Sequence, residues 1–427
     1  SSDMKLKKLL TQIKRASFDL AQVNNRKKNK FLNNLDQILR AKRKKIIEAN
    51  KKDIAFAKCQ SLSKAFIDRL KLDEKGIDKI IQSLNNIEKM KDPTGQIIEK
   101  RRLNNGLLLQ KISVPIGIIL VIYESRPEVT IDVTALCIKS GNIAILKGGR
   151  EALNTNKVLY KCVKEALKAA NLPEQIITFI KRRDDVKELL KQNKHIDLVI
   201  ARGGYEMVKR VQNMSTIPVL AHSSGGARIY VDKSADLEMA KKIIINSKIS
   251  KPAACNSVDT VIVHQNIAKE FIPQIVKELR RYNVNIFFER SEKPAPSAAE
   301  GFSRNLPQEF SLRGSNNIWN TEFLDLIVSI KIVEDADSAI GFIHKYTKHH
   351  TEGIVAEERK VIDKFVNSID AAAIFINSST RLHDGGVFGM GAEMGISTGK
   401  LHARGPVGLK ELTTYKWIVG GNGQIRE

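Results

Sequence analysis

The spacing of hydrophobic residues divides the chain into a helical start followed by alternating strands and helices. Over residues 4–90, apolar side chains recur every three or four positions, which is the period of amphipathic helices. Polar runs at Asn50–Asp53 and Leu72–Gly76 predict breaks between these helices. The pair Asn105-Gly106 lies between two strand-like stretches and predicts a hairpin turn within residues 100–111.

From Pro115 onward, short apolar runs alternate with segments of helical period, a pattern that predicts βαβ units and parallel sheets. The predicted strands of a first lobe are Ile116–Tyr123, Ile143–Leu146, Ile176–Ile180 and Ile196–Ala201, and its helices are Val129–Lys139, Leu153–Ala170, Asp185–Lys191 and Tyr205–Met214. Those of a second lobe are strands Ala227–Val231, Val258–His264, Asn285–Phe288, Leu326–Val333, Gly353–Ala356 and Ala372–Asn377, with helices Asp236–Ile245, Ala268–Arg281, Ala336–His344 and Glu358–Val366. We expect residues 290–318 to form an irregular surface excursion.

Composition narrows the class of protein. With 427 residues, 42% of them hydrophobic, the chain is long enough for two or three globular lobes. It has no apolar run of membrane-spanning length, so we expect no membrane contact. Neither a CxxC pair nor a His/Cys/carboxylate cluster with ligand spacing occurs, so we expect no metal site, no disulfide framework and a reducing cytoplasm. The four cysteines are Cys59, Cys137, Cys162 and Cys255.

The chain is strongly basic, with a formal net charge of +24. Residues 1–110 contribute much of it, because they hold 27 Lys and Arg against 12 Asp and Glu. A nucleic-acid surface is one interpretation of such a charge. The basic runs carry no interleaved aromatic residues for stacking on bases, however, which favours solvated helix faces and no nucleic-acid partner. The charge also suits an anionic substrate and cofactor.

A short segment around Cys255 has the composition of a reactive thiol site. Cys255 follows two alanines and Pro252 and precedes Asn256, between a predicted helix and a predicted strand. Small neighbours leave access to the sulfur, and access and a lowered pKa are what a thiolate nucleophile needs. A buried cysteine that acts as a small hydrophobic residue is the alternative.

Two glycine turns end predicted strands of the first lobe, Lys147-Gly148-Gly149 and Arg202-Gly203-Gly204. Glycine at the carboxyl end of a parallel strand lets the backbone approach a ligand, and the following helix favours phosphate. Each turn alone is also compatible with an ordinary strand-to-helix connection. Two such turns in one sheet, each with a cationic neighbour, point to a phosphate-bearing cofactor.

Two further segments carry groups suited to an anionic substrate. Arg126 follows Glu124 at the end of the first strand, where α/β folds hold ligands, although a local Glu–Arg pair is an equal alternative. Residues 380–405 are glycine-rich and lack helical period, and long irregular segments in compact domains are usually functional. Their cationic and hydrogen-bonding side chains, suited to carboxylate or phosphate, include Thr380, Arg381, Lys400, His402 and Arg404.

Several of these segments together resemble one family. VPIGIILVIYESRPEVTIDV (114–133), GNIAILKGG (141–149), STIPVL (215–220), KPAACNSVDT (251–260) and the long span 376–417 are similar to the gamma-glutamyl phosphate reductase family, within the aldehyde dehydrogenase superfamily. The similarity runs from about residue 5 to the C-terminus. It implies an α/β fold with a Rossmann-like cofactor domain, a catalytic domain and a small β oligomerisation element. The domains expected are 4–102 with 121–225 for the cofactor, 226–405 for catalysis, and 103–120 with 406–427 for oligomerisation.

The resemblance also implies a reaction and its residues. The family reduces gamma-glutamyl phosphate to glutamate 5-semialdehyde and phosphate with NADPH, in proline biosynthesis. Cys255 matches the nucleophile that forms a thioester, with backbone amides at Cys255 and Asn256 for the oxyanion. Lys147 matches the lysine on the adenosine ribose, the Arg202-Gly203-Gly204 turn lies near the pyrophosphate, and Glu322 matches the glutamate on the nicotinamide ribose. We predict Arg126, Lys400, His402 and Arg404 for the substrate's anionic groups, and a homo-oligomer, dimer or tetramer.

The sequence departs from the family pattern just before the strand at 227–231. Ala227-Arg228 stand where family members generally have Cys-His, at the end of a glycine-rich loop (221–228) that we expect close to the nucleophile. Ala221 leaves no carboxylate where hydrolytic aldehyde dehydrogenases place a general base. Two alternatives stay open: an enzyme of the same kind for another acyl phosphate or aldehyde, and a non-catalytic descendant that binds ligands or nucleic acid through its basic face.

Overall fold

The computed structural model describes residues 2–221, 224–288 and 318–426. The chain forms two compact units, which are described separately. Unit 1 comprises Ser1–Ala221 and Gly389–Glu427, and unit 2 comprises His222–Phe388. The glycine-rich segment from Gly389 onward therefore packs with the first part of the chain, whereas we assigned residues up to 405 to the domain of Cys255. The irregular excursion expected at 290–318 lies almost entirely outside the described residues.

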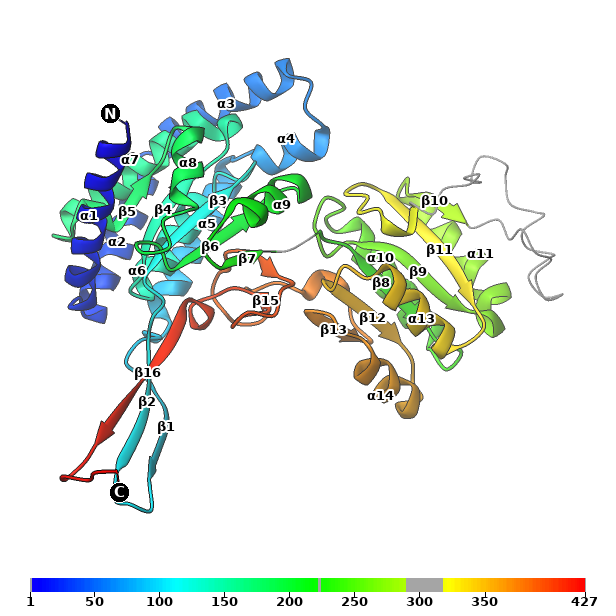
Figure 1. Ribbon diagram of the computed structural model, residues 1–427. Coiled ribbons are helices and arrows are strands. Elements are labelled where there is room, and N and C mark those ends of the chain that lie inside the picture. Colours follow the sequence, from blue (N-terminus) through cyan, green and yellow to red (C-terminus); the bar gives the residue numbers. More distant parts are fainter. Residues whose placement is uncertain (1, 222–223, 289–317, 427) are drawn as a thin grey trace. The chain divides into compact units, whose positions relative to one another are not determined.

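Five helices form the start of unit 1, as the apolar spacing predicts (Figure 1). Their bounds are α1 Ser2–Ala21, α2 Asn25–Ala41, α3 Arg43–Cys59, α4 Lys64–Leu70 and α5 Glu74–Lys89. The break predicted at Asn50–Asp53 is wrong, because this stretch is the middle of α3. Two of its polar side chains are buried and bonded: Asn50 Nδ2 donates to the carbonyl of Leu70 at 2.9 Å, and Asp53 accepts the N–H of Thr155 at 2.8 Å. Asp73 caps α5, so the break at Leu72–Gly76 is confirmed.

The central sheet of unit 1 is parallel, with strand order β5-β4-β3-β6-β7. Each strand is a short apolar run that the sequence predicts, apart from β7. The strands are β3 Ile118–Tyr123, β4 Ile143–Lys147, β5 Ile177–Phe179, β6 Leu198–Arg202 and β7 Val219–Ala221. The intervening helices are α6 Val129–Lys139, α7 Leu153–Ala169, α8 Arg183–Leu189 and α9 Tyr205–Met214, with single turns at Arg150–Ala152 and Glu174–Ile176.

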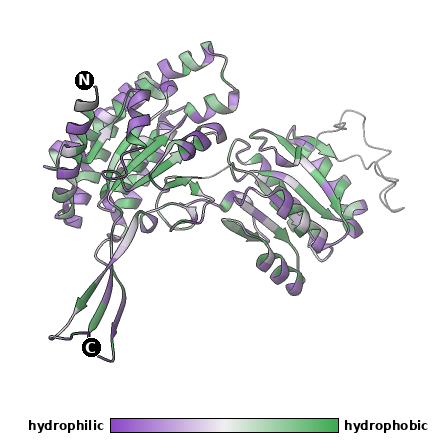
Figure 2. Cartoon of the chain, in the orientation of Figure 1, coloured by the Kyte–Doolittle hydropathy of each residue, from purple (hydrophilic) through white to green (hydrophobic). Residues whose placement is uncertain are grey.

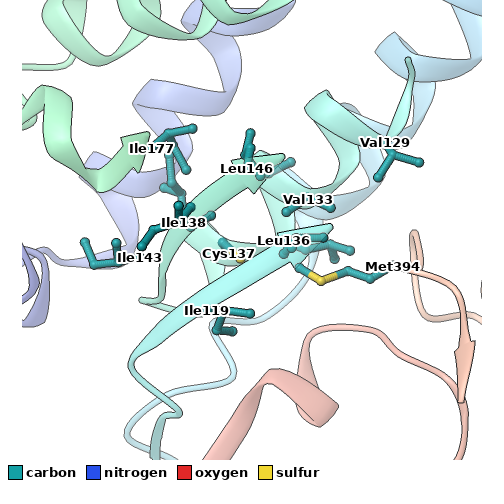
Figure 3. Close-up of a cluster of buried hydrophobic side chains, with 14 of the residues drawn as sticks. Ile119, Val129, Val133, Leu136, Cys137, Ile138, Ile143, Leu146, Ile177 and Met394 are labelled. Atoms are coloured by element: carbon teal, nitrogen blue, oxygen red, sulfur yellow. The ribbon is translucent and has the colours of Figure 1, made fainter. Parts of the chain in front are cut away.

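The core of unit 1 lies between this sheet and its helices. Ile119, Cys137 and Leu146 are fully buried and belong to one cluster (Figure 3). Met394, which follows the whole of unit 2 in the sequence, reaches the same cluster. The C-terminal segment is thus part of the core of unit 1. The hydropathy of the residues agrees with a core between sheet and helices. Apolar residues gather on the strands, and the helices carry both polar and apolar residues (Figure 2).

A three-stranded antiparallel arm projects from unit 1 (Figure 1). Its strands are β1 Ile97–Arg102, β2 Leu108–Pro115 and β16 Thr413–Gly420, with β2 in the middle. The hairpin predicted around Asn105-Gly106 is confirmed. Its connection covers residues 103–107, in which Gly106 has a positive φ of +88° that favours glycine. The arm begins before residue 103, where we placed its start, and residues 118–120 belong to β3 of the central sheet. Short pieces β14 Ile396–Ser397 and β15 Gly405–Pro406, and a turn at Lys410–Leu412, precede β16.

Unit 2 is a six-stranded parallel sheet, ordered β10-β11-β9-β8-β12-β13, and helices cover both faces. Alternate residues point to opposite faces: Val261 and Val263 pack with helices α10 and α11, whereas Ile262 packs with α13 and α14. The strands are β8 Ala227–Val231, β9 Val258–His264, β10 Asn285–Phe288, β11 Ile327–Val333, β12 Thr351–Val355 and β13 Ala373–Ile376. The helices are α10 Leu237–Ile249, α11 Gln265–Arg281, α13 Ala336–Tyr346 and α14 Arg359–Ser368, with single turns at Ile318–Asn320 and Thr380–Leu382.

Each unit thus has the predicted α/β architecture, with strand and helix positions close to those read from the sequence. None of the helices that the structure describes combines the length and hydrophobicity of a membrane span.

Candidate active site

Cys255 lies in the turn between α10 and β9 of unit 2, and its side chain is partly exposed. Cys137 and Cys162 are buried, and burial raises the pKa of the Cys162 thiol to about 11. The turn is tied to the start of β8, because the N–H of Gly226 donates to the carbonyl of Cys255 at 2.7 Å. Of the four cysteines, Cys255 is the one that is partly exposed and lies in a turn of small residues.

Asn256 anchors this turn through all of its side-chain polar atoms. Its Nδ2 donates to the carbonyl of His383 at 2.9 Å, and its Oδ1 accepts from Arg381. The hydroxyl of Thr380 donates to the carbonyl of Asn256 at 2.7 Å. The Asn256 side chain therefore holds the turn in place. Any oxyanion contact by Asn256 has to come from its backbone N–H, which stays a prediction. Thr380 and Arg381 support the turn of Cys255.

Glu322 and Cys255 border the same small space above Gly225. A Cβ atom built on Gly225 would lie 2.2 Å from Oε1 of Glu322 and 2.6 Å from Cβ of Cys255, so nothing larger than glycine fits there. Three strands bring them together, since Gly225 precedes β8, Cys255 precedes β9 and Glu322 precedes β11, and β8, β9 and β11 are neighbours. Gly225 and Gly226 of the glycine-rich loop thus lie against Cys255, as we expected of the loop; residues 222–223 are outside the described part.

Behind this space is a buried ion pair of Lys248 and Asp259, with Nζ 3.7 Å from Oδ1. Burial raises the pKa of Asp259 to about 6, against the opposing effect of Lys248. Burial likewise lowers the pKa of Lys248, and Asp259 opposes that shift. A charged pair beside the candidate nucleophile is not suggested by any local sequence pattern, because its two members lie on a helix and a strand without unusual composition.

Arg228, the departure from the family pattern, is directed into the interior of unit 2. Its guanidinium pairs with Glu352 at 3.2 Å, and it donates to the carbonyl of Trp319 at 3.2 Å and to that of Tyr346. Burial raises the pKa of Glu352, and Arg228 opposes that shift. The substitution is therefore accommodated as a buried ion pair within the core.

The glycine turns of unit 1 lie at one edge of its sheet. Lys147 ends β4 and pairs with Ile122 of β3, and Arg202 ends β6 and pairs with Tyr123 of β3, so both strands finish beside the end of β3. The carboxyl edge of a parallel sheet is where α/β folds bind ligands. The structure thus brings together the two turns that the sequence suggested for a cofactor.

Glycine is required in these turns by close neighbours. A Cβ atom on Gly148 would lie 2.3 Å from Nδ2 of Asn156, and one on Gly203 would lie 2.5 Å from Oε2 of Glu124. Glu124 accepts the N–H of Gly204 at 3.0 Å, and burial raises the pKa of Glu124. The Glu124 carboxylate therefore stands at the start of α9.

The residues proposed for substrate anions are distributed over the C-terminal segment and β3–α6 of unit 1. Arg126 is partly buried and interacts electrostatically with Arg202. Lys400 and His402 are exposed, and the imidazole Nε2 of His402 is 2.7 Å from the carbonyl oxygen of Glu411. Arg404 is partly buried. All four belong to unit 1.

Comparison with known proteins decides the family. A model of the aldehyde dehydrogenase family matches residues 2–300. The gamma-glutamyl phosphate reductase of Dictyoglomus thermophilum is 42% identical over 420 residues, covering 98% of both chains. That of Caldanaerobacter subterraneus is 44% identical over 417 residues, covering 97% of this chain and 98% of the relative. The crystal structure of gamma-glutamyl phosphate reductase from Thermotoga maritima matches with a TM-score of 0.90 and 41% identity, covering 99% of this chain and all of that one.

The chain belongs to the gamma-glutamyl phosphate reductase family. The resemblance predicted from the motifs and the aldehyde dehydrogenase-like fold are both confirmed, and the chain is an oxidoreductase. Family membership implies a nicotinamide cofactor. The crystal structure of an acetylating aldehyde dehydrogenase from Geobacillus thermoglucosidasius, at 20% identity and a TM-score of 0.72, shares the fold.

The carboxyl edge of the unit 1 sheet fits such a cofactor. Gly148 and Gly203 leave no room for side chains, which keeps the backbone open to a ligand. Nδ2 of Asn156 is buried beside Gly148 and has no hydrogen-bond partner within the described residues, so a donor is available next to that turn. A carboxylate stands beside each turn, because Glu124 accepts the N–H of Gly204 and a Cβ atom on Gly149 would lie 2.0 Å from Oε1 of Glu151.

Two residues of this site were missed from the sequence, Lys248 and Asp259, whereas the loop that contains Gly225 was expected close to the nucleophile. No local pattern marks Lys248 or Asp259 as members of the site.

Proposed function

We propose that this chain reduces gamma-glutamyl phosphate to glutamate 5-semialdehyde and phosphate with NADPH, in proline biosynthesis. The observation that carries the proposal is the near full-length similarity to gamma-glutamyl phosphate reductases, together with Cys255 on a partly exposed turn beside Glu322. Ala221 suits this reaction, because it offers no carboxylate to activate water for hydrolysis of the thioester.

In this mechanism the thiolate of Cys255 attacks the acyl carbon of gamma-glutamyl phosphate. A carbon–sulfur bond forms, the acyl–phosphate bond breaks, and inorganic phosphate leaves with its electron pair. Backbone N–H groups at Cys255 and Asn256 hold the developing oxyanion, each donor contributing about 3 kcal/mol in comparable enzymes. The product of this half-reaction is a thioester on Cys255.

The nicotinamide cofactor, when bound, supplies the hydride that reduces the thioester. This chain's own contribution to the second half is to orient the groups and to release the product. The tetrahedral thiohemiacetal loses its thiolate, and the proton of its hydroxyl is given up as the aldehyde forms. Cys255 is thereby returned to its starting state. We assign NADPH to Lys147, Gly148 and Gly149, with Arg202, Gly203 and Gly204 beside it, and Glu322 to the nicotinamide ribose.

For the substrate's anionic groups we propose Arg126, Lys400, His402 and Arg404. Cationic side chains provide the charge-assisted hydrogen bonds that carboxylate and phosphate require. His402 is held by the carbonyl of Glu411, so its ring can present one nitrogen to a ligand while the other stays bonded. A cysteine thiol that serves as a nucleophile, as we propose for Cys255, suits a reducing compartment such as the cytoplasm.

The experiment is phosphate-dependent reduction of NADP+ with glutamate 5-semialdehyde, followed at 340 nm. Cys255→Ala should abolish the activity, because no thioester can form. Cys59→Ala is the matched control, since Cys59 is an exposed free cysteine of unit 1 and should leave the rate unchanged. Full activity of Cys255→Ala would overturn the mechanism. Activity with other aldehydes but none with the semialdehyde would reassign the substrate.

We further propose that the arm mediates homo-oligomerisation. The β16 strand is the edge of a three-stranded sheet, and apolar side chains along it are exposed, among them Trp417 at 44% and Val419 at 52%. An exposed edge of this kind readily pairs with another chain. Light scattering should show a dimer or tetramer that Val419→Lys converts to monomer, and a monomeric parent chain would refute the proposal.

A further inference from the structure

The buried pair Lys248–Asp259 is connected to the segment that carries Glu322. This segment, residues 321–326, has no regular structure and joins the turn Ile318–Asn320 to β11. Asp259 is 6% exposed, and its Oδ1 accepts the N–H of Phe323 at 3.2 Å. Lys248 is fully buried, and its Nζ donates to the carbonyl of Asp325 at 3.1 Å.

The residue between these two attachment points has a strained backbone. Leu324 has a φ of +53°, a left-handed conformation that leucine rarely adopts. Such conformations persist only where the surroundings enforce them, and they occur preferentially at functional sites. The two hydrogen bonds to Phe323 and Asp325 flank Leu324 and supply that enforcement.

The presence of a buried ion pair is by itself weak evidence of a contribution to stability. A buried ion pair costs desolvation, and replacing one with packed apolar residues is often neutral or stabilising. The pair also lies close to the nucleophile, because Oδ2 of Asp259 is 3.0 Å from where a Cβ of Gly226 would be, and Gly226 donates to the carbonyl of Cys255. It contacts both loops that border Glu322 and Cys255.

We propose that Asp259 and Lys248 are positioning residues that fix the 321–326 segment, so that the Glu322 carboxylate stands beside Cys255. The proposal rests on the proposed function for the role of Glu322 with the cofactor. It adds that Glu322 acquires its place from a charged pair distant in sequence and from the strained turn at Leu324. Neither residue of the pair needs to touch substrate or cofactor.

The test is a double-mutant cycle between Asp259→Asn and Glu322→Gln. The first readout is the Kd for NADPH, measured by fluorescence titration. Each single variant should weaken NADPH about tenfold, the value of one lost, well-placed hydrogen bond. If Asp259 acts through Glu322, the double variant should bind within about twofold of Glu322→Gln alone. Losses that multiply to about a hundredfold would overturn the proposal.

A second readout does not involve the cofactor. Glu322→Gln removes a negative charge beside Cys255, and Asp259→Asn should displace that charge from it. Either change favours the Cys255 thiolate, so both single variants should speed alkylation of Cys255 by iodoacetamide, about threefold, and the double variant no further. Mass spectrometry locates the modified cysteine. If the alkylation rate of Cys255 is unchanged in Asp259→Asn and the losses in NADPH affinity are additive, the pair has no positioning role.

Rescue separates positioning from ordinary destabilisation. Glycine adopts the left-handed conformation without strain, so Leu324→Gly should restore most of the NADPH affinity lost in Asp259→Asn. Phe365→Leu is the matched control: it truncates a fully buried side chain of α14 in the same unit and should lower the Tm without changing the Kd. If Asp259→Asn fails to fold, Lys248→Met serves in the same cycle.

The outcomes distinguish this proposal from the proposed function. If the parent chain binds no NADPH but shows the non-additive alkylation pattern, the positioning role of the pair stands and the proposed cofactor is wrong. If the chain binds NADPH and the losses in affinity are additive, the proposed cofactor stands and the positioning role of the pair is wrong. Failure of Leu324→Gly to rescue, with a lowered Tm as in Phe365→Leu, assigns the pair to stability alone.

Discussion

Gly225 offers a sharp test of how closely Glu322 and Cys255 are packed. A methyl group at this position would lie 2.2 Å from Oε1 of Glu322, 2.6 Å from Cβ of Cys255 and 2.8 Å from its Cα. Non-bonded carbon atoms prefer about 3.5–4.0 Å, so Gly225→Ala must move the Cys255 backbone by about 1 Å. Glu322 can rotate away, but the Cα atom of Cys255 cannot move without its turn.

The expected loss follows from that displacement. Misplacing a reacting group by about 1 Å costs about a hundredfold in rate, or about 2.7 kcal/mol of transition-state stabilisation. We therefore expect kcat/KM for the semialdehyde to fall about a hundredfold, and overpacking to lower the free energy of unfolding by about 1–3 kcal/mol. Steady-state kinetics and urea denaturation measure the two quantities.

The matched control is Gly341→Ala. Gly341 is exposed within α13, and nothing lies within 4 Å of the position of its Cβ. Alanine there should stabilise unit 2 by about 0.5–1 kcal/mol and leave kcat/KM unchanged. A Gly225→Ala enzyme within threefold of the parent kcat/KM, with unchanged stability, would refute the close packing described for Glu322 and Cys255.

Two further predictions concern buried polar groups of unit 2. Arg228→Met leaves the Glu352 carboxylate buried without its partner, so urea denaturation should show a loss of about 3–5 kcal/mol, most of which Arg228→Met combined with Glu352→Leu regains. Burial lowers the pKa of His350 to about 4 and, together with the neighbouring His350 charge, that of His383 to about 3. In the unfolded chain these histidines have their ordinary pKa and bind a proton at a higher pH than in the folded chain. The free energy of unfolding is therefore at its full value above about pH 6.5 and falls as the pH drops toward 4, by up to about 1.4 kcal/mol per pH unit per histidine. His350→Gln should flatten that slope by about one proton, and an unchanged slope would contradict the assignment.

The local pattern of apolar and polar residues was sufficient to predict most of the strands and helices. The α6 helix was predicted with the bounds it has, because its apolar period and the flanking strands agree. The break at Asn50 was mispredicted since a polar run usually marks solvent, whereas here Asn50 hydrogen-bonds the backbone of the α4–α5 connection. Polar residues that satisfy distant backbone groups cannot be distinguished from surface residues by periodicity.

The candidate site was predictable to the extent that its members carry local signals. Cys255 stands among small residues, and Lys147 and Arg202 stand beside glycine turns. Asp259 and Lys248 carry no such signal, because their significance depends on a segment more than sixty residues later in the chain. Leu324 is likewise an ordinary hydrophobic residue in the sequence, and its strained backbone exists only in the folded structure.

The division of unit 1 between the two ends of the chain has a consequence for biosynthesis. Residues 222–388 leave the ribosome as an uninterrupted stretch and have their own sheet and cores. Unit 1 lacks Met394 in its core and β16 beside β2 until the last residues are made. Unit 2 can therefore complete its fold first, although it is encoded second. During that interval the edge of β2 that later receives β16 is open, and this is the period in which the nascent chain depends most on protection from aggregation.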